Sequence, residues 1–219
     1  MDQYDFSKSK KRFLTSFFLI ILTILFIRFD FFLVYTLIVL GTISIIEFLD
    51  ITKRITVNKL YLFISNLSFV SYVFTFCFLL IFFFKFTQLK ILLIILLFVC
   101  VASDIGGYIF GKTFKGPKLT KISPNKTIAG AIGSLFLSSL VIILLFYFIN
   151  EKINYMTIVV AIITSIFCQL GDLFFSFLKR KANLKNTSNF LPGHGGVLDR
   201  LDSILLGIPA GLFSFILFF

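Results

Sequence analysis

Long apolar runs separated by short polar breaks dominate the pattern along the chain. Seven runs can be delimited, at residues 13–27, 31–49, 60–84, 90–106, 127–149, 155–177 and 201–219. A helix that crosses a bilayer needs about 20 mostly apolar residues, and these runs approach or reach that length. None shows the apolar/polar alternation of a barrel strand. The pattern predicts an all-α, polytopic transmembrane helical bundle of about seven spans, with residues 1–219 forming a single domain.

Composition agrees with a membrane protein. Mean hydropathy is +1.04 and charged residues make up 14% of the chain, against about a quarter in a soluble domain. The three cysteines, Cys77, Cys100 and Cys168, lie inside apolar runs without the spacing of metal ligands. We therefore interpret them as small buried side chains rather than as a disulfide or a zinc site.

Basic residues predict the orientation. If the N-terminal segment is cytoplasmic, the cytoplasmic side holds 17 of the 21 Lys and Arg residues, leaving Arg28, Lys85, Lys90 and Lys152 outside. The chain has a net charge of +11, and such a positive charge is also typical of proteins that bind nucleic acid. In a membrane chain it more often marks cytoplasmic loops and contact with anionic lipid, so we expect the lipid bilayer and no nucleic acid as a partner.

Two polar segments fall on this cytoplasmic side, and the first covers residues 104–130. Asp104 ends a predicted span, glycines follow, and a Ser-Pro turn lies at Ser123. Five lysines come before the next span: Lys112, Lys115, Lys118, Lys121 and Lys126. Such a segment can cradle phosphate, because lysine supplies charge and glycine lets backbone N–H groups approach an anion. The alternative is an ordinary basic loop, which we favour for Lys112, Lys115 and Lys118.

The second polar segment covers residues 172–202. If the sixth span continues as a helix through residue 180, Asp172, Ser176 and Lys179 share one face. Asp199 and Asp202 share a face at the start of the seventh span. Carboxylates at the cytoplasmic ends of two helices suit a hard cation, which prefers oxygen ligands. The alternative is that these acids cap a helix or are solvated.

Three further polar residues have competing interpretations. His194 lies between glycines in "PGHGG" and is either a phosphate-binding or acid–base group, or a local hydrogen-bond anchor. Glu47 and Asp50, at the end of the second run, have no matching cluster of polar residues. We interpret these two acids as solvated residues at a helix end.

The motifs in the two polar segments resemble those of one enzyme family. "SFLKRKANLKNTSNFLPGHGGVLDRLD", residues 176–202, is similar to the signature of phosphatidate cytidylyltransferases, also called CDP-diacylglycerol synthases. "ISPNKTIAG" and "SDIGGYIFGK" are similar to two further elements of that family. The chain departs from the family pattern at Ala129, Phe175 and Asn186, where members carry acids.

The resemblance implies that CTP and phosphatidate react to give CDP-diacylglycerol and pyrophosphate, with Mg²⁺ required. It implies that Asp172 and Asp199 bind the metal and take part in catalysis, supported by Asp202 and Asp104. The basic residues implied to neutralise phosphates are Lys126, Lys179 and Arg180. The other implied substrate-binding residues are Ser123, Ser176, Lys185, His194, Gly195, Gly196 and Arg200.

Other functions remain open from the sequence alone. A channel or transporter would place polar residues at mid-span, and these spans are nearly free of them. A CTP-dependent polyprenol-type lipid kinase would share the basic loops and the metal but would not be expected to carry the complete "PGHGGVLDRLD". A catalytically weakened family member is a third alternative. The oligomeric state is open, a homodimer included.

The orientation can be tested by labelling. A cysteine introduced at Lys118 or at Asn189 is expected to react with a membrane-impermeant reagent only from the cytoplasmic side. Labelling of intact and permeabilised cells measures this, and reaction from the outside at either position would contradict the predicted topology.

Overall fold

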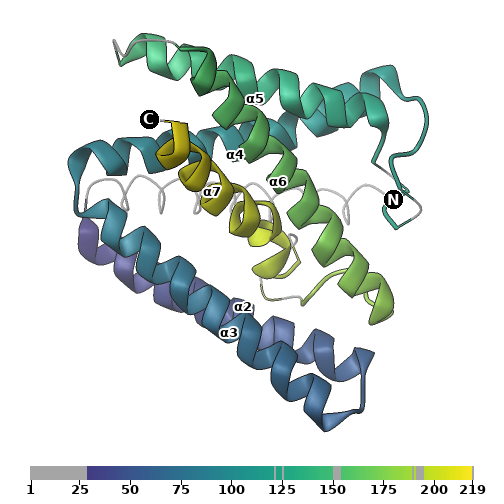
Figure 1. The fold of residues 1–219 in the computed structure, drawn as a ribbon. Helices are drawn as coiled ribbons and strands as arrows, with labels where there is room; N and C mark the ends of the chain where they lie inside the picture. The colour runs from purple at the N-terminus through teal and green to yellow at the C-terminus, as the bar shows by residue number, and fades with distance from the viewer. Residues whose placement is uncertain are drawn as a thin grey trace, which may run out of the picture. The chain divides into compact units, whose positions relative to one another are not determined.

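The computed structural model describes residues 29–218 except 121, 125, 150–153, 189 and 191–194. These residues form six long helices (Figure 1), each long and apolar enough to cross a membrane. They are α2 (Asp30–Ile55), α3 (Lys59–Phe84), α4 (Thr87–Phe114), α5 (Ile128–Phe148), α6 (Tyr155–Lys181) and α7 (Leu198–Phe218). The all-α class and the membrane-protein assignment are thus supported. The predicted run at 13–27 lies outside the described residues, so the count of seven spans and the orientation stay predictions.

Six predicted runs coincide with helices, but several boundaries were wrong. α2 continues to Ile55, α4 continues to Phe114, and α7 begins at Leu198 rather than at residue 201. Each extension adds polar residues that hydropathy alone assigns to loops. As a result Asp104 lies inside α4 rather than at the end of a span, and Asp199 lies in the first turn of α7.

The structure divides into two compact units, and α6 and α7 each contribute to both. One unit contains the chain up to Phe82 together with Leu178–Arg200; the other contains Phe83–Phe177 together with Leu201–Phe219. We call them unit 1 and unit 2 and describe each by itself.

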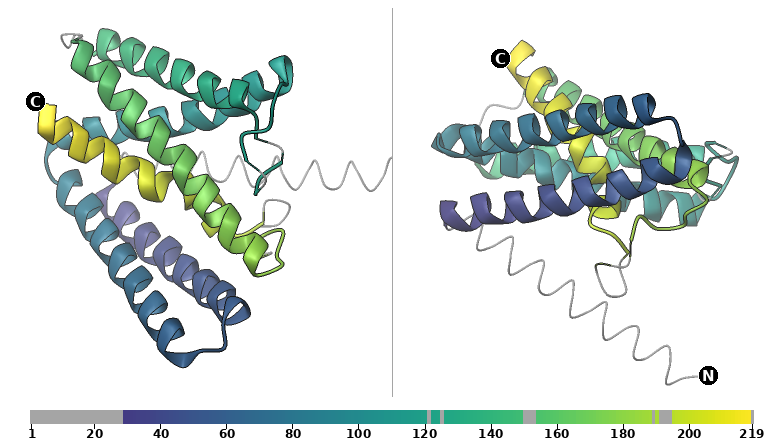
Figure 2. Two further views of the ribbon diagram at one scale, coloured as in Figure 1. Left: turned by 45° about the vertical axis from the view of Figure 1, so that its right-hand side comes forward. Right: turned by 90° about the horizontal axis from the view of Figure 1, so that it is seen from below.

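In unit 1, α2 and α3 form an antiparallel pair that runs side by side in every view (Figure 2). The rings of Phe48 and Phe69 stack with their centroids 3.9 Å apart. One turn further on, the Thr52 hydroxyl donates to the Asn66 side chain at 2.8 Å. A partly buried polar pair of this kind helps to fix the register between two largely apolar helices.

In unit 2, α4 and α5 pack closely because glycines lie at their contact. A Cβ added to Gly106 would lie 2.5 Å from the carbonyl oxygen of Gly133, and a Cβ on Gly133 would collide with the Phe110 side chain. Small residues let helix backbones approach where no hydrophobic effect drives association in lipid. The glycines of "SDIGGYIFGK" therefore have a role in helix packing, and phosphate binding by this segment stays a prediction.

Unit 2 also contains the remaining parts of α6 and α7, which run antiparallel. Gly171 of α6 faces the backbone of Asp202, and Gly207 of α7 faces the Cys168 side chain. The hydroxyls of Ser103 and Ser165 join α4 to α6 at 2.7 Å. Polar bonds inside the bundle thus supplement close packing.

Candidate active site

A short loop after α4 positions Lys126 in unit 2. The Leu119 N–H donates to the Lys126 carbonyl at 2.8 Å, and the Ile128 N–H donates to the Pro117 carbonyl at 3.1 Å. Thr127 then caps α5, since its hydroxyl oxygen accepts the Gly130 N–H at 3.1 Å. These bonds fix the backbone on both sides of Lys126, so the loop is a paired turn rather than an open basic segment.

From this turn the Lys126 ammonium reaches the Asp172 carboxylate on α6, with Nζ 2.8 Å from Oδ2. The two residues are 46 positions apart in the sequence and were both predicted site residues. Their side chains are 29% and 26% exposed, so the pair is open enough for a ligand to reach. A lysine held at a carboxylate can exchange that partner for a phosphate.

Two other predicted acids also belong to unit 2. The Ser203 hydroxyl donates to Asp104 Oδ2 at 3.0 Å, which joins α7 to α4. Asp202 is buried, and one of its oxygens accepts the Ser203 N–H at 3.0 Å. The charges of Asp104 and Asp172 lie close enough to interact. Unit 2 therefore brings Asp104 near Asp172 and Lys126, and their role as a metal or substrate site stays a prediction.

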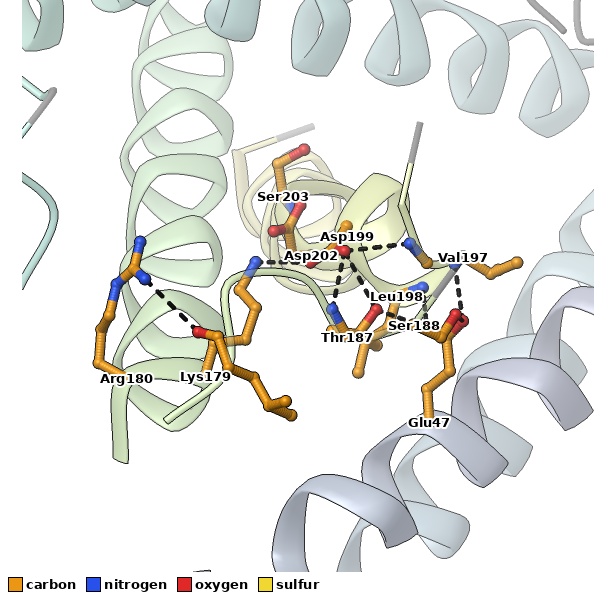
Figure 3. A network of polar contacts seen from close by, with 12 residues as sticks. Glu47, Lys179, Arg180, Thr187, Ser188, Val197, Leu198, Asp199, Asp202 and Ser203 are labelled. Atoms are coloured by element: carbon orange, nitrogen blue, oxygen red, sulfur yellow. Dashed lines mark hydrogen bonds and ion pairs between the residues drawn. The ribbon is translucent and has the colours of Figure 1, made fainter. Parts of the chain in front are cut away.

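The second lysine–aspartate pair lies in unit 1 (Figure 3). Lys179 near the end of α6 donates to Asp199 at the start of α7, with Nζ 2.6 Å from Oδ1. Both side chains are 12% exposed, less than half the exposure of the pair in unit 2. Reduced solvent screening strengthens the attraction, and it also raises the cost of leaving either charge unpaired.

The other oxygen of Asp199 organises the entry to α7. Asp199 Oδ2 accepts the N–H groups of Thr187 at 3.0 Å and Gly196 at 3.1 Å, and the Thr187 hydroxyl also lies 3.1 Å away. The bond to a backbone N–H three residues earlier resembles half of a capping box. These bonds support the capping alternative for Asp199, and its role as a site residue stays a prediction.

Glu47 belongs to the same network, and our interpretation of it as a solvated helix-end acid was wrong. The residue is 4% exposed, and its carboxylate points from α2 toward the start of α7 (Figure 3). Oε1 accepts the Ser188 hydroxyl and the Val197 N–H at 3.0 Å. Oε2 accepts the Thr187 hydroxyl and the Leu198 N–H, both at 2.8 Å. The second acid, Asp50, is exposed, as that interpretation predicts.

The glycines of "PGHGG" have a structural explanation at two positions. Gly195 has φ of +86°, in the left-handed region that other residues rarely adopt. A Cβ on Gly196 would collide with the Thr187 hydroxyl and lie within 2.8 Å of both Glu47 carboxylate oxygens. These neighbours account for the two glycines without a ligand, so their substrate-binding role stays a prediction.

The remaining predicted residues are placed less distinctively. α6 continues through residue 180, as predicted, so Asp172, Ser176 and Lys179 lie on one helix. Ser176 is half-buried. Ser123 is half-buried, while Lys185 and Arg200 are exposed. Arg180 donates to the Leu184 carbonyl at 3.4 Å. His194 lies outside the described residues.

The carboxylates of unit 2 are suitable ligands for Mg²⁺, but they are too few to surround the ion by themselves. Asp104 and Asp172 offer the hard carboxylate oxygens that Mg²⁺ prefers. Among the described residues no three His, Cys, Asp or Glu side chains gather closely enough to hold a metal. One or two carboxylates completed by substrate phosphates are the usual arrangement for this ion, and the residues of unit 2 fit it. That Asp172 and Asp199 share a cation stays a prediction.

Comparison with known proteins identifies the family. A family model described as the cytidylyltransferase family matches residues 2–219. The chain belongs to the cytidylyltransferase family. Three of the four residues in the two lysine–aspartate pairs, Lys126, Lys179 and Asp199, lie in the motifs that resemble this family.

Curated relatives named phosphatidate cytidylyltransferase match part of the chain. The protein of Staphylococcus haemolyticus is 47% identical over 109 residues, which are 49% of this chain and 42% of the relative. That of Rickettsia felis is 41% identical over 134 residues, which are 57% of this chain and 59% of the relative. The matched region thus spans about half the length of these relatives.

The buried pair in unit 1 yields a test of the lysine roles. Changing Lys179 to Ala removes the ion-pair partner of Asp199. If Lys179 also neutralises a phosphate, as the resemblance implies, transfer from CTP is expected to lose about 2–4 kcal/mol of transition-state stabilisation. Lys112→Ala, in the last turn of α4, is the matched control and should change the rate little. Equal, small effects in steady-state assays would show that Lys179 has a structural role in its ion pair and neutralises no phosphate in the reaction.

Proposed function

We propose that this chain transfers CMP from CTP to phosphatidate, giving CDP-diacylglycerol and pyrophosphate for phospholipid biosynthesis. The family match over residues 2–219 is the observation that carries the proposal. The choice of phosphatidate as acceptor is supported by the names of the curated relatives. Six apolar helices are consistent with an acceptor that resides in the bilayer.

The chemistry is an in-line exchange at phosphorus. A phosphate oxygen of phosphatidate attacks the α-phosphorus of CTP, the new P–O bond forms, and the bond to the β-phosphate oxygen breaks. Pyrophosphate leaves with the electron pair of that bond. The lipid phosphate is already ionised near neutral pH, so the reaction needs no general base, and His194 is assigned to phosphate binding rather than proton transfer.

Basic residues would supply most of the electrostatic stabilisation from the protein. The ammonium groups of Lys126 and Lys179 lie at carboxylates, where two aspartates hold them in place. In the reaction they would turn toward the triphosphate and the lipid phosphate and neutralise charge that builds up on the oxygens. Arg180, next to Lys179 at the end of α6, would add a further positive charge.

Mg²⁺ is the proposed cofactor. When bound with CTP, it would neutralise phosphate charge and favour departure of pyrophosphate. Asp172 would hold it with support from Asp104, and the carboxylate chemistry of unit 2 fits this assignment.

The cellular setting follows from the same proposal. Both polar segments lie on the side that the distribution of basic residues assigns to the cytoplasm, where CTP is available. We therefore place the protein in a bacterial-type cell membrane with the reaction at its cytoplasmic surface. Phosphatidate would enter laterally from the lipid.

A product assay separates this function from a CTP-dependent lipid kinase. Purified protein with CTP, Mg²⁺ and phosphatidate is expected to release pyrophosphate and form CDP-diacylglycerol in equal amounts. A kinase acting on a polyprenol would instead release CDP and no pyrophosphate. Chelating the divalent cation should abolish the reaction, and re-adding Mg²⁺ should restore it.

Three results would contradict the proposal. One is CDP release with a polyprenol acceptor, and another is product formation that continues unchanged under chelation. The third is failure to use phosphatidate in a preparation whose helical content and thermal unfolding show an intact fold.

A further inference from the structure

Glu47 joins two parts of the signature segment to α2. Its four hydrogen-bond donors come from positions on both sides of residues 189–196: Thr187 and Ser188 before them, Val197 and Leu198 after them. The closest of these partners is 140 positions away in the sequence. One carboxylate therefore holds the beginning and the end of this stretch together.

Burial makes this arrangement depend on all four donors. An unpaired carboxylate at 4% exposure would be strongly unfavourable, and full satisfaction offsets that cost. Two of the donors are backbone N–H groups at the start of α7, which have no acceptor within their own helix. Negative charge is also favourable at a helix N-terminus. Glu47 thus caps α7 from a different helix.

The network continues from Glu47 to the predicted site residues. The Thr187 hydroxyl lies 2.8 Å from Glu47 Oε2 and 3.1 Å from Asp199 Oδ2. A hydroxyl has a single proton, so Thr187 donates to one carboxylate at a time and couples their positions. Asp199 in turn holds Lys179. A displacement of residues 187–188 or 197–198 would therefore move both charged groups.

We infer that Glu47 is a positioning residue for cytidylyl transfer, acting through Thr187 and the first turn of α7 to place Asp199 and Lys179. The inference rests on the proposed function. Glu47 does not touch a reacting group in this account. Its contribution is to hold the signature segment in the arrangement that Asp199 and Lys179 need.

Glu47→Gln tests the inference, with Asp50→Asn as the matched control. Gln keeps the size of Glu47 but loses its charge, and its NH₂ group cannot accept the donors on that side. Asp50 is an exposed acid three residues further along the same helix, and its replacement removes the same charge without touching the network. Both variants keep Asp199 and Lys179.

The first readout is hydrogen exchange of the purified protein in lipid nanodiscs. In Glu47→Gln the amides of Val197 and Leu198 should exchange about tenfold faster or more, because each loses a charged acceptor. Amides within α3 should keep their protection, and Asp50→Asn should match the wild type. This readout needs no activity, so it decides the structural part even if the proposed reaction is wrong.

The second readout is steady-state kinetics. For Glu47→Gln we expect kcat to fall about ten- to hundredfold, the range seen when a residue that supports a site is lost, with KM for CTP changed less than about threefold. If this variant does not fold, Thr187→Val serves instead, since it removes only the shared hydroxyl and should still lower kcat. Unchanged kcat in a folded variant would overturn the inference. So would unchanged exchange at Val197 and Leu198, or loss of protection throughout α2 and α3.

Discussion

The polar contacts of unit 1 depend on one constraint: the backbone N–H groups at the start of α7 have no acceptor within their own helix. Val197 and Leu198 are buried, so their N–H groups need acceptors from the protein rather than from water. Glu47 accepts the N–H groups of Val197 and Leu198 from α2, and Asp199 accepts the Gly196 N–H just before the helix. Because both acceptors are carboxylates, the solution to a helix-capping problem also concentrates negative charge next to a lysine. The capping of α7 and the candidate chemistry therefore share the same atoms.

Two lysine–aspartate pairs recur as the charged features of the two units. Each joins residues that are distant in the sequence, Lys126 with Asp172 and Lys179 with Asp199. A carboxylate keeps a lysine ordered and neutralised until a more highly charged partner arrives, and a triphosphate is such a partner. Because the Lys179–Asp199 pair is less exposed to solvent than the Lys126–Asp172 pair, we expect it to be more sensitive to substitution.

Hydropathy was sufficient to predict six helices because, in lipid, every apolar run long enough to span must satisfy its own backbone. It could not predict where α4 ends, since glycines that look like loop residues are used there to pack against α5. The shared face of Asp172 and Lys179 followed from helical periodicity. Their ion-pair partners did not, because those pairings depend on loop geometry and helix packing rather than on local spacing.

Glu47 shows the limit of local interpretation most clearly. The signal was a single acid near the end of an apolar run, and a solvated helix end explains most such residues. The alternative could be recognised only from the folded structure, in which residues 187–188 and 197–198 donate hydrogen bonds to Glu47. The identity of the partners is set by the tertiary fold, and no pattern within α2 contains it.

The most direct measurement of the central claim, that Asp199 serves the reaction as well as the helix cap, is single-turnover pyrophosphate release by Asp199→Asn. Asn keeps the size and one oxygen acceptor but removes the charge that holds Lys179. We expect Asp199→Asn to lose nearly all Mg²⁺-dependent turnover while the protein still inserts and shows native-like thermal unfolding. A folded variant that retains most of the wild-type rate would contradict it and leave Asp199 as a structural cap alone.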